Sequence, residues 1–139
     1  MPEKSLVLEI CALDRAPLRL DATEVGVPGV MGLFVVLPGH APLLSTLEVG
    51  VLNAKFVDGT QHAFAINGGF CEVLNDRVLI LAQTVEMDIE IDLARAQAAR
   101  DRAELRLREP EGTIDVARAD AALKRAIARI RAAEKPSSL

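Results

Sequence analysis

The chain has 139 residues, of which 50% are hydrophobic and 26% charged, and its formal net charge is −4. A chain of this size buries roughly two-thirds of the surface that its unfolded form exposes, so it can build a core without disulfides or metal. This composition excludes disordered and collagen-like proteins. No apolar run reaches the roughly 18 residues of a membrane-spanning helix, and no secretory signal follows Met1. We therefore expect the protein to stay in the compartment where it is made.

Cysteine and aromatic residues are sparse. Cys11 and Cys71 lie far apart in strand-like segments, which is typical of reduced core thiols in a cytosolic protein. Aromatic residues make up 3% of the chain, with no Trp and no Tyr. Binding of single-stranded nucleic acid through base stacking is therefore not expected.

The first 90 residues alternate apolar and polar positions and are rich in Val, Ile, Leu and Phe, a pattern that predicts strands. The expected strands span residues 6–12, 18–25, 33–37, 51–57, 61–66, 70–74 and 78–84. Asp58-Gly59 and Asn75-Asp76 are expected to form two-residue hairpin turns. Short strands with turns at this spacing predict a β sandwich or flattened barrel.

From Asp92 onward the chain is rich in Ala and Arg, which are strong helix formers. Pro110-Glu111-Gly112 is expected to break this helix. A second helix over 115–133 carries an apolar stripe, namely Val116, Ala119, Leu123, Ile127 and Ile130. We therefore predict an α+β fold, with a sandwich domain over 1–88 and an antiparallel two-helix hairpin over 89–139. Because the stripe consists largely of Ala, the hairpin should pack weakly and be able to move.

Charge differs between the two halves. Residues 1–90 hold five basic and twelve acidic side chains, whereas residues 91–139 hold eleven basic and eight acidic ones, so their balances are −7 and +3. An acidic platform with a basic arm suggests a head that docks and an arm that meets acidic surfaces or phosphates. Asp101, Glu104, Asp115 and Asp120 dilute the positive charge of the arm, so no nucleic-acid partner is expected.

Candidate catalytic and metal-binding residues lack the patterns that such sites need. His40 and His62 have no neighbouring Gly-x-Ser-x-Gly elbow or cysteine signature, so a structural role is favoured over catalysis. Together with Cys11 and Cys71 they also lack the close paired spacing of a zinc site. A glycine-bearing loop is followed by no Gly-Lys-Ser/Thr, so its glycines are expected to be turn residues rather than a phosphate loop, namely Gly26, Gly29 and Gly32.

Two short sequence blocks, around Gly39-His40 and around Gly68-Gly69, contain residues whose conformational preferences explain a local feature of the fold. In the first, Pro38 and Pro42 flank Gly39-His40 and fix a tight corner, where His40 is expected to bond the backbone rather than transfer protons. In the second, Gly68-Gly69 permits a bulge or a close approach between strands, with Phe70 expected in the core. Followed by Ile91-Asp92-Leu93-Ala94-Arg95-Ala96, these blocks resemble the epsilon subunit of F-type ATP synthase, the delta subunit of mitochondria.

This resemblance implies a non-catalytic central-stalk subunit of a proton-translocating synthase. The sandwich of such a subunit binds the gamma subunit and the c-ring, and the hairpin reaches the catalytic beta and alpha subunits and inhibits ATP hydrolysis. It implies a peripheral position at the cytoplasmic face of the bacterial membrane, held there only through the complex. Where the family commonly has Gly, an acidic residue, a hydrophobe and Gly, this chain has Gly32-Leu33-Phe34-Val35. Gly32, Leu33 and Phe34 are therefore expected either to make an apolar c-ring contact or to turn one side chain inward.

The segment 91–96 also matches a motif, Ile/Leu-Asp-x-x-Arg-Ala, with which some bacterial members bind ATP. Carried over to this sequence, the resemblance implies a site made of Glu86, Ile91, Asp92, Arg95, Ala96, Arg102, Arg125 and Arg129. Guanidinium groups suit phosphate because they stay charged and bind its oxygens in pairs. In the alternative interpretation, Asp92 caps the helix and the arginines are surface charges. No cofactor is required, and ATP would be regulatory. A free-standing ATP-binding sensor module stays open as an alternative function.

Overall fold

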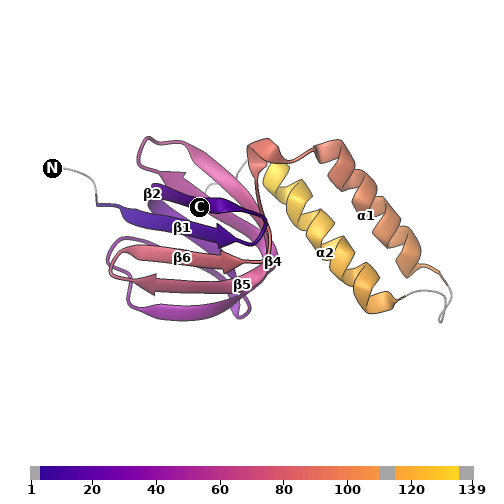
Figure 1. Ribbon diagram of the computed structural model, residues 1–139, viewed down its shortest axis with the longest axis horizontal. Coiled ribbons are helices and arrows are strands. Elements are labelled where there is room, and N and C mark those ends of the chain that lie inside the picture. The colour runs from indigo at the N-terminus through magenta and orange to yellow at the C-terminus, as the bar shows by residue number, and fades with distance from the viewer. Residues whose placement is uncertain (1–3, 110–114, 135–139) are drawn as a thin grey trace.

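The computed structural model describes residues 4–109 and 115–134 (Figure 1). Its strands are β1 (Leu6–Ala12), β2 (Arg15–Gly29), β3 (Gly32–Val36), β4 (Leu43–Phe56), β5 (Gln61–Leu74), β6 (Arg77–Ala82) and β7 (Val85–Met87). Its helices are the short 3-10 helix η1 (Asp88–Glu90), α1 (Leu93–Leu107) and α2 (Val116–Ala133). The predicted α+β fold, a sandwich followed by a helical hairpin, is confirmed. None of the helices in the described ranges is long and apolar enough to cross a membrane. The predicted break at 110–112 lies outside those ranges.

The strands form one sheet that closes on itself as a flattened barrel. The sheet order is β1-β6-β5-β4-β2-β3, and β1 also pairs antiparallel with β2, which closes the barrel. Alternate residues of β1 point inward, so that Leu6, Leu8 and Ile10 are fully buried. They pack with the inward residues of the other strands in one apolar core. The barrel therefore has a core that does not depend on the hairpin.

The β5–β6 turn is the predicted one, and other turns differ from prediction. Asn75 and Asp76 both have positive φ, 49° and 60°, as the predicted two-residue hairpin requires. The β4–β5 turn instead spans residues 57–60 and is closed by a hydrogen bond from Phe56 N to Thr60 O of 2.9 Å. Gly26 and Gly29 are strand residues of β2 rather than turn residues, because the turn lies at 30–31.

The expectation that Phe70 fills the core is wrong. The two strands predicted over 61–66 and 70–74 form one strand, β5, in which Gly68 and Gly69 have φ of +68° and +115°. This irregularity shifts the inward–outward alternation, so Cys71 and Val73 point inward and Phe70 is 52% exposed. Phe70 therefore belongs to the outer surface of the barrel.

Several strands are longer than predicted. β4 begins at Leu43 rather than at residue 51, and β2 extends from 15 to 29 around the predicted 18–25. Pro28 lies in this extension, where it pairs with Leu33 of β3 and where the β2–β4 ladder is interrupted. A proline without an N–H is tolerated at such a break. β7, which pairs with β5, was not predicted.

The hairpin packs on the barrel through α2, and α1 packs on α2 (Figure 1). Asp92 and Asp115 cap the two helices, each accepting a 3.1 Å hydrogen bond from the backbone three residues on. Val116 is 56% exposed, so the predicted stripe of α2 is wrong at that end. The contact between α2 and β5 is centred on four small side chains, here called the alanine contact: Ala63, Ala65, Ala128 and Ala132. Val49, Val51 and Ile91 pack against them.

Candidate nucleotide pocket and docking surfaces

A pocket of about 220 Å³ lies where the barrel, α1 and α2 meet. It is lined by Glu86, Glu90, Ile91, Asp92, Arg95, Ala96 and Arg129. Six of the eight residues that the ATP-binding motif implied therefore lie together. Arg125 lines a smaller adjoining pocket with Glu86 and Arg129. Arg102 is exposed on α1 and lines neither pocket.

Charged side chains in this pocket already hold partners within the chain. Nε of Arg129 donates to Oε1 of Glu86 over 2.7 Å, with both side chains partly exposed. The Asp92 carboxylate accepts from the backbone N–H of Arg95 as a helix cap, while the Arg95 side chain is exposed. A bound phosphate chain would have to compete with Glu86 for Arg129, whereas Arg95 could turn toward it without breaking a described ion pair.

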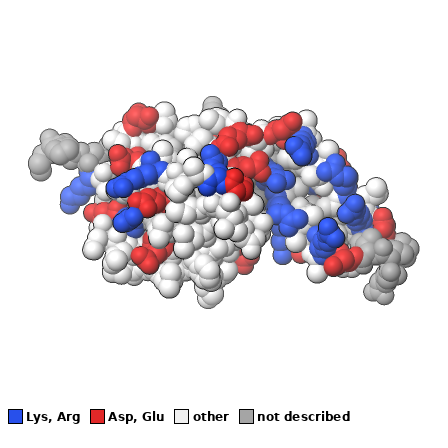
Figure 2. Space-filling model, viewed as in Figure 1, with Lys and Arg blue, Asp and Glu red and all other residues white. Residues whose placement is uncertain are grey.

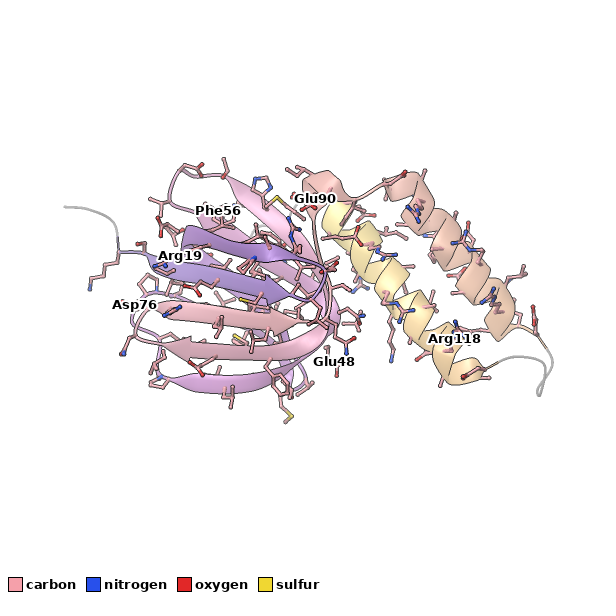
Figure 3. All side chains as sticks on the ribbon, viewed as in Figure 1. Arg19, Glu48, Phe56, Asp76, Glu90 and Arg118 are labelled. Atoms are coloured by element: carbon pink, nitrogen blue, oxygen red, sulfur yellow. The ribbon has the colours of Figure 1, made fainter. Side chains whose placement is uncertain are left out.

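Sequence reasoning missed the residues that hold the linker, residues 85–90, which joins the barrel to the helical hairpin. Glu90 lines the pocket and accepts a 2.8 Å ion-pair hydrogen bond from Arg15 at the start of β2. Asp88 lies 2.9 Å from Nδ1 of His62, and its other oxygen accepts from Ala63 N at 3.1 Å. Figure 3 shows Glu90 at the boundary between barrel and hairpin. The partners are 75 and 26 positions apart in the chain, so no local signal joins them.

The corner between β3 and β4 is held by backbone bonds. Gly39 has φ +85°, and its N–H donates to Oδ1 of Asp76 in the β5–β6 turn over 2.7 Å. The His40 N–H donates to the Leu37 carbonyl, and its ring Nδ1 lies 2.6 Å from the Ala41 carbonyl oxygen. Between Pro38 and Pro42, His40 thus has the backbone partners expected of a structural corner.

The hairpin between β2 and β3 presents an apolar tip. Met31 is 96% exposed and Leu33 68% exposed, next to the exposed Gly32. Phe34 instead packs against the barrel core. One side chain of this segment, Phe34, thus turns inward as one of the two expectations had it. Leu33 points outward, where it is free to make an apolar contact.

A second apolar surface lies on the outer face of β4, β5 and β6. It consists of Leu44, Phe70 and Leu81, which are 70%, 52% and 46% exposed, and Phe70 is paired with Leu81 in the sheet. Clustered exposed apolar side chains mark interaction sites more often than single ones do. We call these three residues the outer apolar face.

The basic arm that the sequence indicated is visible on the molecular surface (Figure 2). In Figure 2, basic side chains gather over the helices, while much of the visible barrel surface is uncharged. Arg118 lies near the start of α2, at the end far from the barrel (Figure 3). The hairpin therefore carries part of its positive charge at the end far from the barrel, where a partner could meet it.

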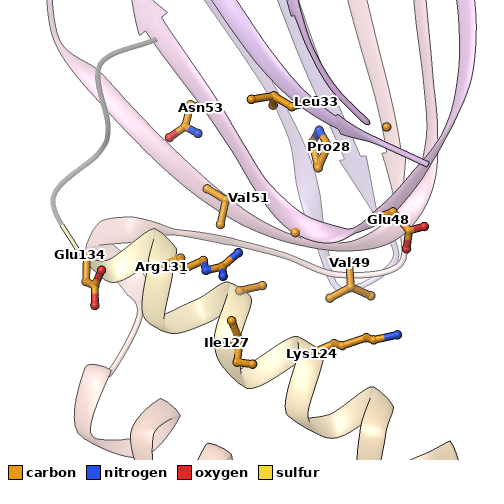
Figure 4. Close-up of a pocket in the computed structure, with 13 residues that line it drawn as sticks. Pro28, Leu33, Glu48, Val49, Val51, Asn53, Lys124, Ile127, Arg131 and Glu134 are labelled. Carbon is orange, nitrogen blue, oxygen red and sulfur yellow. The ribbon is translucent and has the colours of Figure 1, made fainter. Parts of the chain in front are cut away.

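A groove of about 670 Å³ lies between α2 and parts of β2 and β4, beside the alanine contact (Figure 4). Val49 and Val51 line its barrel side, and Lys124, Ile127 and Arg131 line its α2 side. The docked hairpin therefore covers only part of the sheet beneath it.

Thiol chemistry at Cys71 is disfavoured by its surroundings. Burial, with a smaller contribution from the charge of Glu72, raises the pKa of the Cys71 thiol to about 12. A buried thiol with so high a pKa is protonated at neutral pH and is a poor nucleophile or metal ligand.

Two family models match the chain. One, described as the ATP synthase delta/epsilon chain beta-sandwich domain, covers residues 5–88, and the other, described as the long alpha-helix domain, covers residues 90–134. An ATP synthase epsilon chain of Moorella thermoacetica is 47% identical over 105 residues, 76% of this chain and 78% of that relative. One from Nitratidesulfovibrio vulgaris is 47% identical over 107 residues, 77% of this chain and 79% of that relative.

The fold also occurs in a solved structure. A chain of the Euglena gracilis mitochondrial ATP synthase, from a cryo-EM structure that includes the c-ring, superposes with a TM-score of 0.76 at 21% identity, covering 86% of this chain and 76% of that one. The two family models and these relatives define the class of protein, a subunit of an enzyme complex. The chain belongs to the ATP synthase delta/epsilon chain family.

Proposed function

We propose that this chain is a non-catalytic central-stalk subunit of a proton-translocating F-type synthase, coupling rotation to catalysis and inhibiting ATP hydrolysis through its hairpin. The observation that carries the proposal is the alanine contact. A barrel with its own complete core is joined to a two-helix arm by a contact centred on four small side chains, beside an open groove. Small side chains bury little apolar area, so this contact can open at low cost.

The exposed surfaces fit the partners that such a subunit has. The outer apolar face suits the gamma subunit, and the tip with Met31 and Leu33 suits an apolar contact with the c-ring. The arginines of the hairpin suit acidic surfaces on the catalytic beta and alpha subunits. Through these partners the chain would lie at the cytoplasmic face of the bacterial membrane, in a peripheral position held by the complex.

The pocket supports a regulatory role for ATP. Arg95 and Arg129 come from different helices, so a phosphate chain that bridged them would hold the hairpin in its folded arrangement. Arg125 lies beside Arg129 and could join them after a side-chain rotation, whereas Arg102 would need a larger movement. Asp92 caps α1 in this structure, and binding would add a second role to that residue.

Co-purification tests membership in the complex. The tagged chain should recover the gamma subunit and the c-ring from membranes of its own cells. Recovery of neither, together with ATP binding by the isolated chain, would instead support a free-standing sensor module.

Deletion of residues 92–139 tests inhibition. The assembled enzyme should then hydrolyse ATP faster than the wild type, because the arm is gone. Unchanged hydrolysis would show that the arm is not inhibitory here.

Arg95→Ala tests the nucleotide site. A charge-assisted phosphate contact is typically worth about 1.5–3 kcal/mol, so ATP affinity should fall by roughly one to two powers of ten, while helicity is retained. Arg118→Ala is the matched control, since Arg118 is exposed near the far end of α2. Asp92→Asn keeps the cap and removes the charge, so a drop in affinity would show a direct role. If titration calorimetry of the wild type with millimolar ATP gave no heat, the proposed nucleotide site would be refuted.

A further inference from the structure

The linker between barrel and hairpin is fastened to the barrel at two points. One is the ion pair of Glu90 with Arg15, at 2.8 Å, in which Arg15 is 25% exposed. The other is the pair of Asp88 with His62, at 2.9 Å, in which Asp88 is only 10% exposed. Arg15 and His62 come from β2 and β5, so the two points hold the linker to different strands.

The backbone of the linker is held as well. β7 pairs with β5, with Ala65 opposite Glu86. The Asp88 carboxylate accepts from Ala63 N at 3.1 Å and from Ile89 N at 2.8 Å, and Glu90 accepts from Met87 N at 3.3 Å. Residues 85–90 therefore form part of the barrel rather than a free connection.

These tethers end just before the helix begins. Ile91 N donates to the Asp88 carbonyl at 3.3 Å, a long bond, and its side chain packs beside the alanine contact. Asp92 is exposed and has extended backbone angles before α1 starts. The chain is thus fixed to the barrel up to Glu90 and is governed by the hairpin from Asp92 onward.

The residues that line the nucleotide pocket consequently fall into two groups, one fixed to the barrel and one carried by the hairpin. Glu86 and Glu90 belong to the fixed linker, whereas Arg95, Ala96 and Arg129 belong to the hairpin. We propose that Arg15 and His62 are positioning residues for this pocket: they fix its linker wall through Glu90 and Asp88, and the hairpin turns about Ile91 and Asp92. The pocket then assembles only when the hairpin closes on a wall that is already in place, which lowers the ordering cost of binding. We call the pairs Arg15–Glu90 and His62–Asp88 together the clamp. The role of the clamp in nucleotide binding rests on the proposed function, whereas its existence does not.

Amide hydrogen exchange measured by NMR on the full chain tests the clamp. In the wild type the Ala63, Met87 and Ile89 amides should be protected and the Asp92 amide should exchange fast. Arg15→Met combined with His62→Ala should raise exchange at the three protected amides by roughly tenfold, the size of a lost charged hydrogen bond in a local opening. Arg15→Lys with His62→Gln, which retains a donor at both positions, should restore most of the protection.

Arg77→Met is the matched control, because it breaks a 2.7 Å Arg–Glu pair elsewhere on the barrel. It should leave linker exchange unchanged. Exchange in the double variant that equals the wild type, or that rises equally throughout the barrel core, would overturn the clamp. The clamp would also be overturned if the Ala63, Met87 and Ile89 amides of the wild type exchanged as fast as the Asp92 amide.

ATP affinity separates positioning from a purely structural role. The double variant should bind ATP roughly threefold to tenfold more weakly, with the rescue pair in between, because the fixed wall is loosened. Unchanged affinity in a variant with a loosened linker would refute the positioning role. A wild-type protein that binds no ATP would overturn the nucleotide function, while the exchange data would still decide the clamp.

Discussion

Replacing Ala128 with leucine perturbs the alanine contact without touching the barrel core. Ala128 is 4% exposed and packs with Ala63, Ala65 and Ala132. Leucine adds three heavy atoms at a place where small side chains let α2 approach β5. Overpacking of this kind typically costs about 1–3 kcal/mol. Because the barrel can keep its own packing, α2 should move away instead, which corresponds to a shift of about 5- to 150-fold in the docking equilibrium.

Hydrogen exchange of α2, followed by mass spectrometry, measures this equilibrium. Peptides covering α2 should exchange faster in Ala128→Leu, while peptides covering β1 and β6 should be unchanged. Ala117→Leu is the control, since Ala117 is exposed on the same helix. In the assembled enzyme the loosened arm should also inhibit ATP hydrolysis more strongly than the wild type. Equal exchange in the two variants, or loss of barrel protection along with α2, would refute a docked arm held by small side chains.

Three other outcomes follow from the barrel. In the native protein Cys11 should react with a thiol reagent much faster than Cys71, whose pKa burial raises to about 12, and unfolding should abolish the difference; equal native rates would contradict the burial of Cys71. The hydrogen bond from Arg77 lowers the pKa of Glu9, so this pair stabilises the fold above the unfolded pKa of about 4.3 and the contribution disappears as pH falls through the lower folded pKa. Arg77→Met should therefore lower the thermal midpoint at neutral pH and not in strong acid; an equal loss at both would exclude the ion pair as the cause. A chain lacking residues 92–139 should retain β-type circular dichroism, and an unfolded product would refute the independence of the barrel core.

Features set by neighbouring residues could be predicted from the sequence. The cap at Asp92 and the positive-φ pair Asn75-Asp76 each depend on a few adjacent positions, and both are present. The motif segment 91–96 is contiguous, whereas Arg129 reaches the pocket only because α2 docks on the barrel, and the resemblance rather than the local pattern implied it. For the cap and the turn the local pattern carried enough information.

Features set by distant partners could not be predicted. Arg15 meets Glu90 only because β2 and the linker lie side by side in the closed barrel. Phe70 faces outward because of the irregularity at the two preceding glycines, and its direction depends on how β5 pairs with β6. A one-residue shift in a strand exchanges its two faces, so a correct strand prediction can still misplace a side chain.

Gly69→Ala tests whether the irregularity of β5 at Gly68-Gly69 needs a residue without a side chain. Gly69 has φ +115°, and a Cβ there would overlap the Leu81 carbonyl oxygen and lie 2.9 Å from the Ala82 Cα, both backbone atoms of β6. Strain of about 1–3 kcal/mol and a forced strand shift of about 1–3 kcal/mol should together lower the free energy of unfolding by about 2–6 kcal/mol. Gly59→Ala is the matched control, because Gly59 has φ +89° and no atom within 4 Å of the added Cβ, so it carries the strain without the clash. Urea unfolding of both variants separates the two costs, and a Gly69→Ala protein as stable as Gly59→Ala would show that β5 and β6 can separate at this point without loss.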